Sequence, residues 1–543
     1  MVLEPRLTEE AGQHGQEGDQ LDVNTTPDQD AVGGNPIQPL DTDKEAGAPG
    51  DDASLERTRS IASTLSLPRE ILFVGIICLA QFTTQVGLGQ TLFILPVIGR
   101  SFHITDPSQL SWLIAGYSLT VGTFIVISGR LGDIFGYKRM LMVGFSWYAI
   151  WSMVAGLSVY SNHVLFVFAR VLQGIGPAIT LPNGVALLGS TYPPGPRKDM
   201  VFALFGACAP GGSIVGGAFA GVFALTWWPW AFFSLAITLV VIVVLASLII
   251  PDPPKKPEYK AHSMRDKLEL LDLPGAVVGI TALVLFNFAW NQAPIVGWQK
   301  AYVYVTMILG LLLMPLFFYI EFRVSPSPLV PFEALTVEVG FVLACIVCGW
   351  SSFGIWVFYL VSFLEHLRGA SPLLAVAYMS PVAVSGALAS VCTGLILSRM
   401  RAAWVMVIAL AAFTVGQILV ATVPVDQTYW AQTFVCTIII PWGMDMSFPA
   451  ATLILSNSVS KEHQGIAASL VNTIVNYSIS LGLGFAGTVE VHVNNGGRTP
   501  QDILHGYRGA WYLGTGLAGL GMVISAVFLA RAYWKDRNGV RSG

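Results

Sequence analysis

From Ile71 to about residue 531 the chain alternates between long apolar runs and short polar segments. A helix needs roughly 20 apolar residues to cross the hydrocarbon core of a bilayer. Fourteen stretches meet this length, because the uncharged run 200–251 is too long for one helix and must reverse, at TWWPW. The predicted helices cover residues 71–99, 109–129, 140–159, 163–190, 200–225, 230–250, 273–291, 302–321, 337–364, 372–398, 402–422, 429–456, 464–489 and 509–531.

The basic residues predict how these helices are oriented. With the N-terminus in the cytosol, the cytosolic loops and the C-terminus hold 18 Lys and Arg residues, against five in the opposite loops. Positive charge gathers on the cytosolic side of membrane proteins, so both termini are predicted to be cytosolic. The fold class is all-α and polytopic, because helices satisfy their own backbone hydrogen bonds in lipid.

The helices divide into six, two and six around one basic loop. The predicted parts are a disordered acidic tail (1–69), a six-helix bundle (70–251), a basic cytosolic loop (252–271), two linker helices with their loop (272–336), a second six-helix bundle (337–532) and a cytosolic C-terminal tail (533–543). The tail is predicted to be disordered because it is polar and lacks residues that could form a core.

Composition excludes an ordinary soluble protein. The chain is 54% hydrophobic and 11% charged, whereas a soluble domain carries about 25% charged residues. The six cysteines all lie in apolar runs, and the CxxC of Cys345 and Cys348 has no second ligand pair, so helix packing is favoured over a metal site. The net charge of −4 arises mostly in the tail and gives no indication of nucleic-acid binding.

The stretch GRLGDIFGYKRM, residues 129–140, joins the second and third predicted helices. Its glycines would allow a tight turn and close helix ends. We expect the acid to accept hydrogen bonds at a helix N-terminus and the basic residues to face lipid headgroups. An ordinary positive-inside loop is the alternative. The residues concerned are Gly129, Arg130, Gly132, Asp133, Gly136, Lys138 and Arg139.

This stretch resembles the signature G-x-L-[AG]-D-[RK]-x-G-[RK]-[RK] of the major facilitator superfamily. Ile134 and Tyr137 replace two of its basic residues. In the predicted helix 163–190, RVLQGIG is similar to the family segment R-x-x-Q-G-x-G, with Arg170 as its charged residue. The resemblance implies two bundles that alternate between states, with the loop acting as a gate latch.

The predicted helix 200–225 resembles the glycine- and proline-rich antiporter motif of the same family. In that motif a kinked helix with a small-residue face packs on the opposite bundle. The matching residues are Pro210, Gly211, Gly216 and Gly217; Ala209 stands where glycine is expected, and the second glycine pair is displaced. Fourteen helices resemble the fungal drug:proton antiporter branch, and the chain looks closest to aminotriazole-resistance and boron-efflux-type transporters.

Asp445 is the only acid well inside any predicted helix. Burial favours its protonated form, as a proton-coupled site requires, and Pro441, Gly443 and Pro449 would allow local unwinding. A structural carboxylate is the alternative, and a pair with Arg170 is left open. Gln81 and Gln85 share one helical face and would hydrogen-bond either substrate or a neighbouring helix.

The sequence therefore predicts a monomeric secondary transporter that exports a small organic molecule in exchange for protons. It lacks the ATP-binding motif G-x-x-x-x-G-K-[ST], and its one G-x-G-x-x-G match, residues 482–487, lies inside an apolar span. The proton gradient would therefore supply the energy, with no cofactor and no metal. Transport of a small polar solute such as borate or ammonium is the alternative, and a non-transporting membrane sensor a remote one. Its partners would be a small-molecule substrate and the lipid bilayer, and its location the plasma membrane or the vacuolar membrane.

Overall fold

The structure is a computed structural model that describes residues 66–104, 107–192, 196–251, 270–326, 328–329, 336–397, 399–457 and 464–537. Most of the predicted acidic tail, residues 252–269 of the predicted basic loop and residues 538–543 of the predicted C-terminal tail lie outside the described residues.

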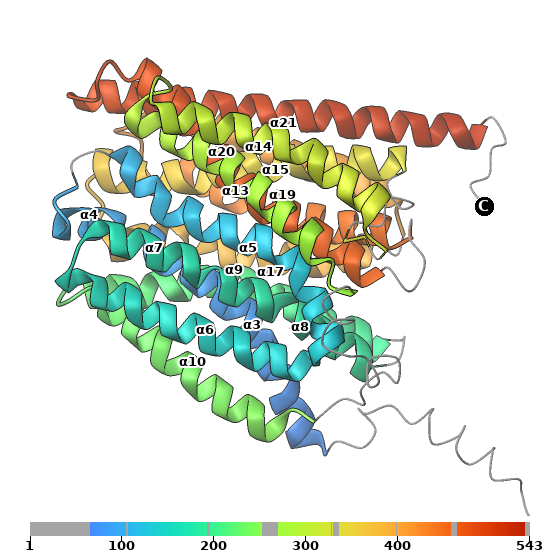
Figure 1. Cartoon of the computed structure of the whole chain (residues 1–543). Helices are drawn as coiled ribbons and strands as arrows, with labels where there is room; N and C mark the ends of the chain where they lie inside the picture. The colour runs from blue at the N-terminus through green and yellow to red at the C-terminus, as the bar shows by residue number, and fades with distance from the viewer. Residues whose placement is uncertain are drawn as a thin grey trace, which may run out of the picture. The chain divides into compact units, whose positions relative to one another are not determined.

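Fourteen helices in the described part are long and apolar enough to cross a membrane, as the hydropathy pattern predicts (Figure 1). The first six spans are α3 (Leu67–Leu92), α5 (Pro107–Phe135), α6 (Tyr137–Leu157), α7 with α8 (His163–Gln173, Ile175–Thr191), α9 (Pro196–Ala224) and α10 (Trp230–Ile249). The linker spans are α13 (Leu273–Val296) and α14 (Ala301–Tyr319), which continues into the π-helix η2 (Ile320–Val324).

The last six spans form the second bundle. They are α15 (Val337–Ser362), which continues into the π-helix η4 (Phe363–Leu367), α16 with α17 (Pro372–Met379, Pro381–Leu397), α18 (Ala402–Ala421), α19 (Gln432–Asn457), α20 (Gln464–Val493) and α21 (Pro500–Arg537). Two short helices lie at one end of the first bundle, α4 (Leu95–Ser101) and η1 (Ser158–Tyr160). We call this end the α4 end, and the end that carries residues 129–140 the motif end.

Several helix boundaries differ from the hydropathy pattern. The first apolar run, 71–99, holds two helices, because the chain turns at Phe93 and Ile94 before α4. The tenth span breaks at Ser380, directly before Pro381, whose ring cannot donate a backbone hydrogen bond. Helix α5 continues to Phe135, six residues beyond its predicted end. Charged residues end the apolar run in its last turns, but they do not end the helix.

Glycines let α3 and α9 touch along their backbones within the first bundle. A Cβ atom on Gly89 would lie 2.0 Å from the carbonyl oxygen of Ser213, and one on Gly216 would lie 2.6 Å from that of Val86. In lipid the hydrophobic effect does not drive helices together. The van der Waals contacts of such closely approaching backbones stabilise the helix pair instead.

The two bundles meet along two pairs of helices, α5 with α20 and α9 with α16 and α17. On the first pair, a Cβ on Gly122 would lie 2.7 Å from the backbone nitrogen of Tyr477. On the second pair, Gly221 packs on Leu373 at the α4 end. The first bundle therefore approaches the second through glycines at both contacts.

The linker helix α13 packs on both α5 and α20. Its Asn291 donates from Nδ2 to the carbonyl oxygen of Ser480 over 3.2 Å. The Ser480 hydroxyl lies 2.9 Å from Oδ1 of Asn287 and 2.9 Å from the carbonyl oxygen of Ala115 on α5. One polar junction thus joins the linker to both bundles.

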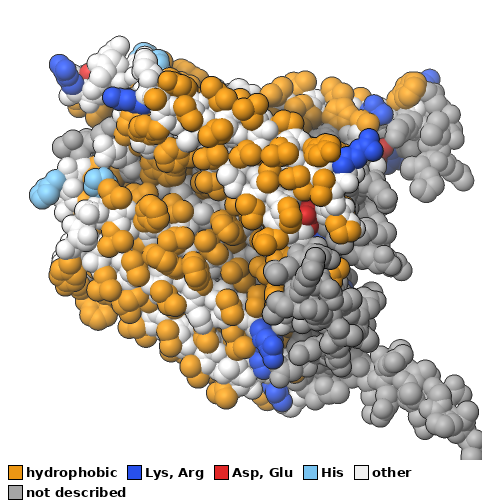
Figure 2. All heavy atoms as spheres, in the orientation of Figure 1, with side chains coloured by type: hydrophobic (Ala, Val, Ile, Leu, Met, Phe, Trp, Pro, Cys, Tyr) orange, Lys and Arg blue, Asp and Glu red, His pale blue; other side chains and the backbone are white. Residues whose placement is uncertain are grey.

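Hydrophobic side chains cover the middle of the face in Figure 2, and Lys and Arg gather toward its two edges. The linker helix α14 illustrates the apolar surface: Ile308, Leu311 and Leu312 are more than half exposed. A water-exposed surface of this kind would aggregate, whereas a bilayer accommodates it.

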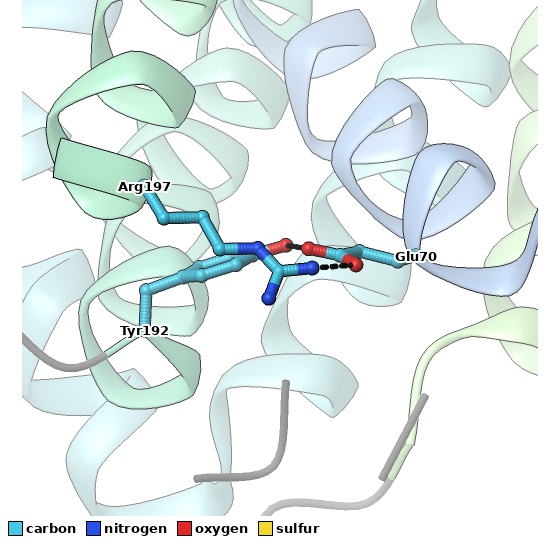
Figure 3. A network of polar contacts seen from close by, with 3 residues as sticks. All are labelled: Glu70, Tyr192 and Arg197. Atoms are coloured by element: carbon cyan, nitrogen blue, oxygen red, sulfur yellow. Dashed lines mark hydrogen bonds and ion pairs between the residues drawn. The ribbon is translucent and has the colours of Figure 1, made fainter. Parts of the chain in front are cut away.

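At the motif end, a buried carboxylate ties three helices together (Figure 3). Glu70 on α3 accepts a hydrogen bond of 2.8 Å from the Tyr192 hydroxyl, just after α8, and forms an ion pair with Arg197 on α9. Burial and the bond to Glu70 raise the pKa of the Tyr192 hydroxyl, so this group remains a donor.

We expect Arg197→Ala to lower the thermal unfolding midpoint by a few degrees, because the buried Glu70 carboxylate loses its cationic partner. The neighbouring Lys198→Ala, which removes a charge of the same sign outside this network, is the matched control. Adding Glu70→Gln should restore part of the loss, since it removes the charge left unpaired. Tryptophan fluorescence during heating measures the midpoints; equal midpoints for the two single variants would show that the ion pair contributes nothing.

Candidate functional site

The motif of residues 129–140 lies mostly inside α5 and α6 and not in a loop. Gly136 alone separates the two helices, and its φ of 100° is the backbone conformation that glycine adopts most readily. The N-cap residue of α6 is Gly136, which has no side chain to cap the helix, and Tyr137 is the first residue of α6. Asp133 lies in the last turn of α5 and accepts a hydrogen bond from the Tyr137 hydroxyl.

The other motif residues contact neighbouring helices or the segments that flank the linker helices. A Cβ on Gly132 would lie 1.9 Å from Oδ1 of Asn183 on α8, so glycine is required for this contact. Gly129 faces Ser469 of α20, in the opposite bundle. Arg130 donates to the carbonyl oxygens of Leu270 and Pro328, which flank the linker helices. Lys138 is partly exposed and Arg139 is exposed.

Arg170 on α7 is completely buried and solvated by protein oxygens. Its Nε donates to the carbonyl oxygen of Leu113 on α5 over 3.1 Å, and its Nη2 to that of Gly87 on α3 over 2.9 Å. Its Nη1 donates to Gln173, and its guanidinium lies 4.4 Å from the ring centre of Tyr117. Arg170 therefore holds α3, α5 and α7 together.

Arg170 and Asp445 form no ion pair, because the guanidinium of Arg170 donates to Leu113, Gln173 and Gly87 instead. The two candidates therefore act separately. Gln173, from the same family segment as Arg170, donates to the Ser152 hydroxyl on α6 over 2.6 Å and so extends the junction to a fourth helix.

Asp445 lies near the middle of α19, where α9 of the first bundle crosses α17 of the second. A Cβ on Gly386 of α17 would lie 2.7 Å from Oδ2 of Asp445 and 3.1 Å from the ring of Pro210 on α9. The absence of a side chain on Gly386 lets the carboxylate and Pro210 approach the same point. We call these residues, with Gly212, the α9 crossing.

Among the described residues, the carboxylate of Asp445 has a single hydroxyl neighbour, and one of its oxygens has no hydrogen-bond partner. Ser390, one turn along α17 from Gly386, is positioned to hydrogen-bond the carboxylate. Oδ2 is buried and, among the described residues, has no hydrogen-bond partner. The predicted local unwinding is wrong, because α19 is a continuous helix through both Pro441 and Pro449.

The predicted glutamines lie beside the same stretch of α9. Gln85 on α3 approaches Gly212, whose added Cβ would lie 3.0 Å from that of Gln85. Gln81 and Gln85 are both partly exposed, and neither hydrogen-bonds another described residue. Amides that joined helices would be bonded, so the geometry favours amides available to a solute.

The glycines of the antiporter-like motif divide between two surfaces. Gly216 and Gly217 pack on Val86 and Phe93 of the first bundle, not on the opposite bundle as the resemblance implies. Gly211 has open space around it. Only Pro210 of this motif reaches the second bundle, at Gly386. Close packing within the bundle explains the displaced glycine pair.

Sequence reasoning missed a second group of acids. Glu365 lies in η4 at the end of its span and Glu490 three residues before the end of α20, and Glu490 packs between helices at the α4 end. Their signal was weak, because an acid near the end of a hydropathy run is usually exposed. In the described part of the chain, no three His, Cys, Asp or Glu side chains converge as a metal site would need.

The model of the major facilitator superfamily matches residues 77–483 and 341–540. The chain belongs to the major facilitator superfamily. It is 53% identical over 499 residues to a low affinity ammonium transporter of Saccharomyces cerevisiae, covering 92% of this chain and 96% of that protein. It is 49% identical to the efflux pump terJ of Aspergillus terreus, covering 87% of this chain and 90% of that one.

A third relative matches the branch expected from sequence. The aminotriazole resistance protein of S. cerevisiae is 37% identical, with 86% of this chain and 85% of that protein covered. Superfamily membership confirms the predicted fold of two six-helix bundles with two linker helices, and it identifies the chain as a multi-pass membrane transporter of a small molecule, not an enzyme.

We expect Gly386→Ala to lower the unfolding midpoint, because the added methyl overpacks the α9 crossing at a cost of about 1–3 kcal/mol. Gly394→Ala, on the same helix with nothing within 4 Å of its Cβ, is the matched control and should be neutral or stabilising. Adding Asp445→Ala should recover part of the loss in Gly386→Ala. Identical midpoints for the two glycine variants would contradict the close contact.

Proposed function

We propose that the chain is a proton-coupled antiporter that exports a small organic molecule by alternating access. The observation that carries this proposal is the position of Asp445, a mid-span carboxylate at the α9 crossing with one buried oxygen unbonded within the described residues. An ionised carboxylate in apolar surroundings needs partners or a proton. Proton binding there would neutralise the group when no cation or water is available.

The α9 crossing offers a physical link between protonation and movement of the bundles. Pro210 belongs to the first bundle, and Gly386 and Asp445 belong to the second. A neutral Asp445 can stay buried beside Gly386 and Pro210. An ionised Asp445 is more stable in contact with water, so its ionisation would favour separation of α9 from α17. Proton release and substrate binding would then occur in the same open state, as exchange requires.

Gln81 and Gln85 support a polar, hydrogen-bonding substrate. Their amides both donate and accept, and they lie on the α3 face beside α9. With Asp445 on the opposite bundle, a solute between them would meet neutral amides on one side and one carboxylate on the other. This arrangement suits a small molecule that carries amine or amide-like nitrogens.

Transport of ammonium is the second candidate. It is favoured by the 53% identity to the low affinity ammonium transporter. A single carboxylate could also bind a small cation of this kind, so the site chemistry serves both candidates. The energy source proposed for either is the proton gradient, and the motif end, which carries the basic residues of 129–140, is proposed to face the cytosol.

The test is transport in inside-out membrane vesicles from a yeast strain that expresses the full chain. Radiolabelled aminotriazole and methylammonium are the two probes, and a pH gradient, acidic inside, is imposed. We expect gradient-driven accumulation of at least one probe, and we expect Asp445→Asn to abolish the stimulation by the gradient. Binding of aminotriazole should persist, because asparagine keeps the shape of the site.

Asp426→Asn is the matched control, since Asp426 is an exposed acid at the α4 end of the same bundle. This variant should retain gradient-driven transport. Full stimulation by the pH gradient in Asp445→Asn would overturn the proton role of Asp445. Accumulation of methylammonium but not of aminotriazole, above the passive trapping of this weak base in vesicles from cells without the chain, would favour the second candidate.

A further inference from the structure

The linker helix α13 packs closely on α20 of the second bundle. Two glycines of α20, from the G-x-G-x-x-G match noted in the sequence, make this contact. A Cβ on Gly484 would lie 3.0 Å from the carbonyl carbon of Trp290, and one on Gly487 would lie 3.2 Å from the ring of Pro294. Larger side chains at these glycines would push the helices apart, so the sequence of α20 is suited to holding α13 against it.

Hydrogen bonds extend this contact toward the motif end. The hydroxyl of Tyr477 on α20 donates to the carbonyl oxygen of Leu283 on α13 over 2.9 Å. Asn291 of α13 donates from Nδ2 to the carbonyl oxygen of Ser480 over 3.2 Å. Together with the glycine contacts, these bonds run along about three turns of α20. They hold α13 to the second bundle.

A different set of contacts joins this unit to α5 of the first bundle. Nε1 of Trp112 on α5 donates to Oε1 of Gln292 over 3.1 Å, and its ring lies 5.6 Å from that of Phe288. The hydroxyl of Ser480 lies 2.9 Å from the carbonyl oxygen of Ala115 on α5. Trp112 and Ala115 lie in the first third of α5, so these contacts hold the α4 half of the bundle interface closed.

Ser480 has two acceptors for one proton. Its hydroxyl lies 2.9 Å from the carbonyl oxygen of Ala115 and also 2.9 Å from Oδ1 of Asn287 on α13. A hydroxyl carries one hydrogen, so it donates to one of the two at a time. Ser480 and Asn287 are both 0% exposed, and a donor left without an acceptor there would be costly. Asn287 therefore offers an acceptor that stays beside Ser480 when α5 moves away.

We propose that α13 moves with the second bundle, and that Ser480 and Gln292 form a clamp on α5 that opens when the Ser480 hydroxyl turns from Ala115 to Asn287. The proposal rests on the alternating access of the proposed function and adds the means by which the α4 half of the interface is held and released. In the closed state Ser480 donates to Ala115 and Trp112 donates to Gln292. Opening at the α4 end breaks both bonds.

Both bonds lost on opening have replacements. Ser480 turns to Asn287, and the indole nitrogen of Trp112, near the start of α5, can donate to water that enters between the bundles. Gln292 stays bonded through Nε2 to the hydroxyl of Tyr302, over 3.2 Å. The clamp therefore biases the equilibrium without preventing opening. Loss of one such bond in one state alone should change the ratio of the two populations roughly two- to tenfold.

The test measures the distance between the bundles without any substrate. Spin labels at Ser101→Cys on α4 and Gln501→Cys on α21, both exposed positions, report the separation at the α4 end. The full chain, with its six native cysteines replaced, is reconstituted in lipid nanodiscs and measured by double electron–electron resonance at fixed pH. Trp112→Phe keeps the ring against Phe288 and removes the bond to Gln292. It should raise the ratio of the longer to the shorter distance roughly two- to tenfold.

Trp147→Phe is the matched control. Nε1 of Trp147 donates to the carbonyl oxygen of Leu172 over 2.7 Å, and both residues belong to the first bundle. This variant loses the same kind of bond away from the interface, so its ratio should equal that of the parent. Equal ratios in the parent and Trp112→Phe would overturn the proposal. An equal rise in both tryptophan variants would also overturn it, because the effect would not be specific to the clamp.

Asn287→Leu tests the second acceptor and should act in the opposite direction. Introduced into the Trp112→Phe chain, it should lower the ratio of the longer to the shorter distance about twofold or more, because Ser480 loses its acceptor in the open state and keeps Ala115 in the closed one. The bond from Asn291 to Asn287 lies within α13 and is lost in both states. An unchanged or higher ratio would contradict the clamp.

A third label position tests which bundle the linker follows. Lys300, between α13 and α14, is exposed. From a label at Lys300→Cys, the distance to position 501 should be single, and the distance to position 101 should show the two populations seen between 101 and 501. A single distance to position 101 with two distances to position 501 would show that the linker moves with the first bundle, which would overturn the proposal.

The clamp and the proposed function fail separately. The clamp contacts involve no charged group, so Trp112→Phe should raise the ratio in a chain that also carries Asp445→Asn. Transport that ignores the pH gradient, together with the predicted ratios, would overturn the proposed function and leave the clamp standing. Gradient-driven transport with the same ratio in the parent and Trp112→Phe would overturn the clamp alone.

Discussion

A charged side chain in the hydrocarbon core of a bilayer costs at least about 2.5–3.5 kcal/mol unless the protein solvates it. Arg170 and Asp445 meet this constraint in opposite ways. The guanidinium of Arg170 donates to three oxygens and lies over an aromatic ring, so its charge is fully accommodated. One oxygen of Asp445 is left without a partner among the described residues, and a proton is the simplest group that can satisfy it.

Arg170 is therefore a permanent structural contact between helices, whereas Asp445 is a site at which a proton can bind reversibly. Arg170 lies within the first bundle and joins helices that move together. Asp445 lies where the two bundles touch, and Gly386 brings it against Pro210 with no side chain between them. Because packed interfaces of this kind have little room to deform, a change in the charge of Asp445 is expected to alter the contact between the bundles themselves.

The sequence predicts the fold well because hydropathy alone decides how many helices can cross a bilayer. The sequence-based prediction fails for features that hydropathy does not determine. Helix α5 continues through Arg130 and Asp133, since polar residues at a membrane surface can still be helical. The partners of Arg170 are backbone carbonyls, which no side-chain pattern reveals. Glu490 of α20 accepts a hydrogen bond from Tyr359 of α15, and only tertiary packing brings these two residues together.

The central claim is that a proton bound at the bundle interface drives the movement of substrate. The most direct measurement is the substrate ratio at zero net flux across proteoliposomes that hold the purified chain, with the membrane potential clamped to zero. For exchange of one proton, the account predicts that each unit of pH difference supports about a tenfold substrate ratio. A substrate ratio that stays at one for every pH difference would contradict the account.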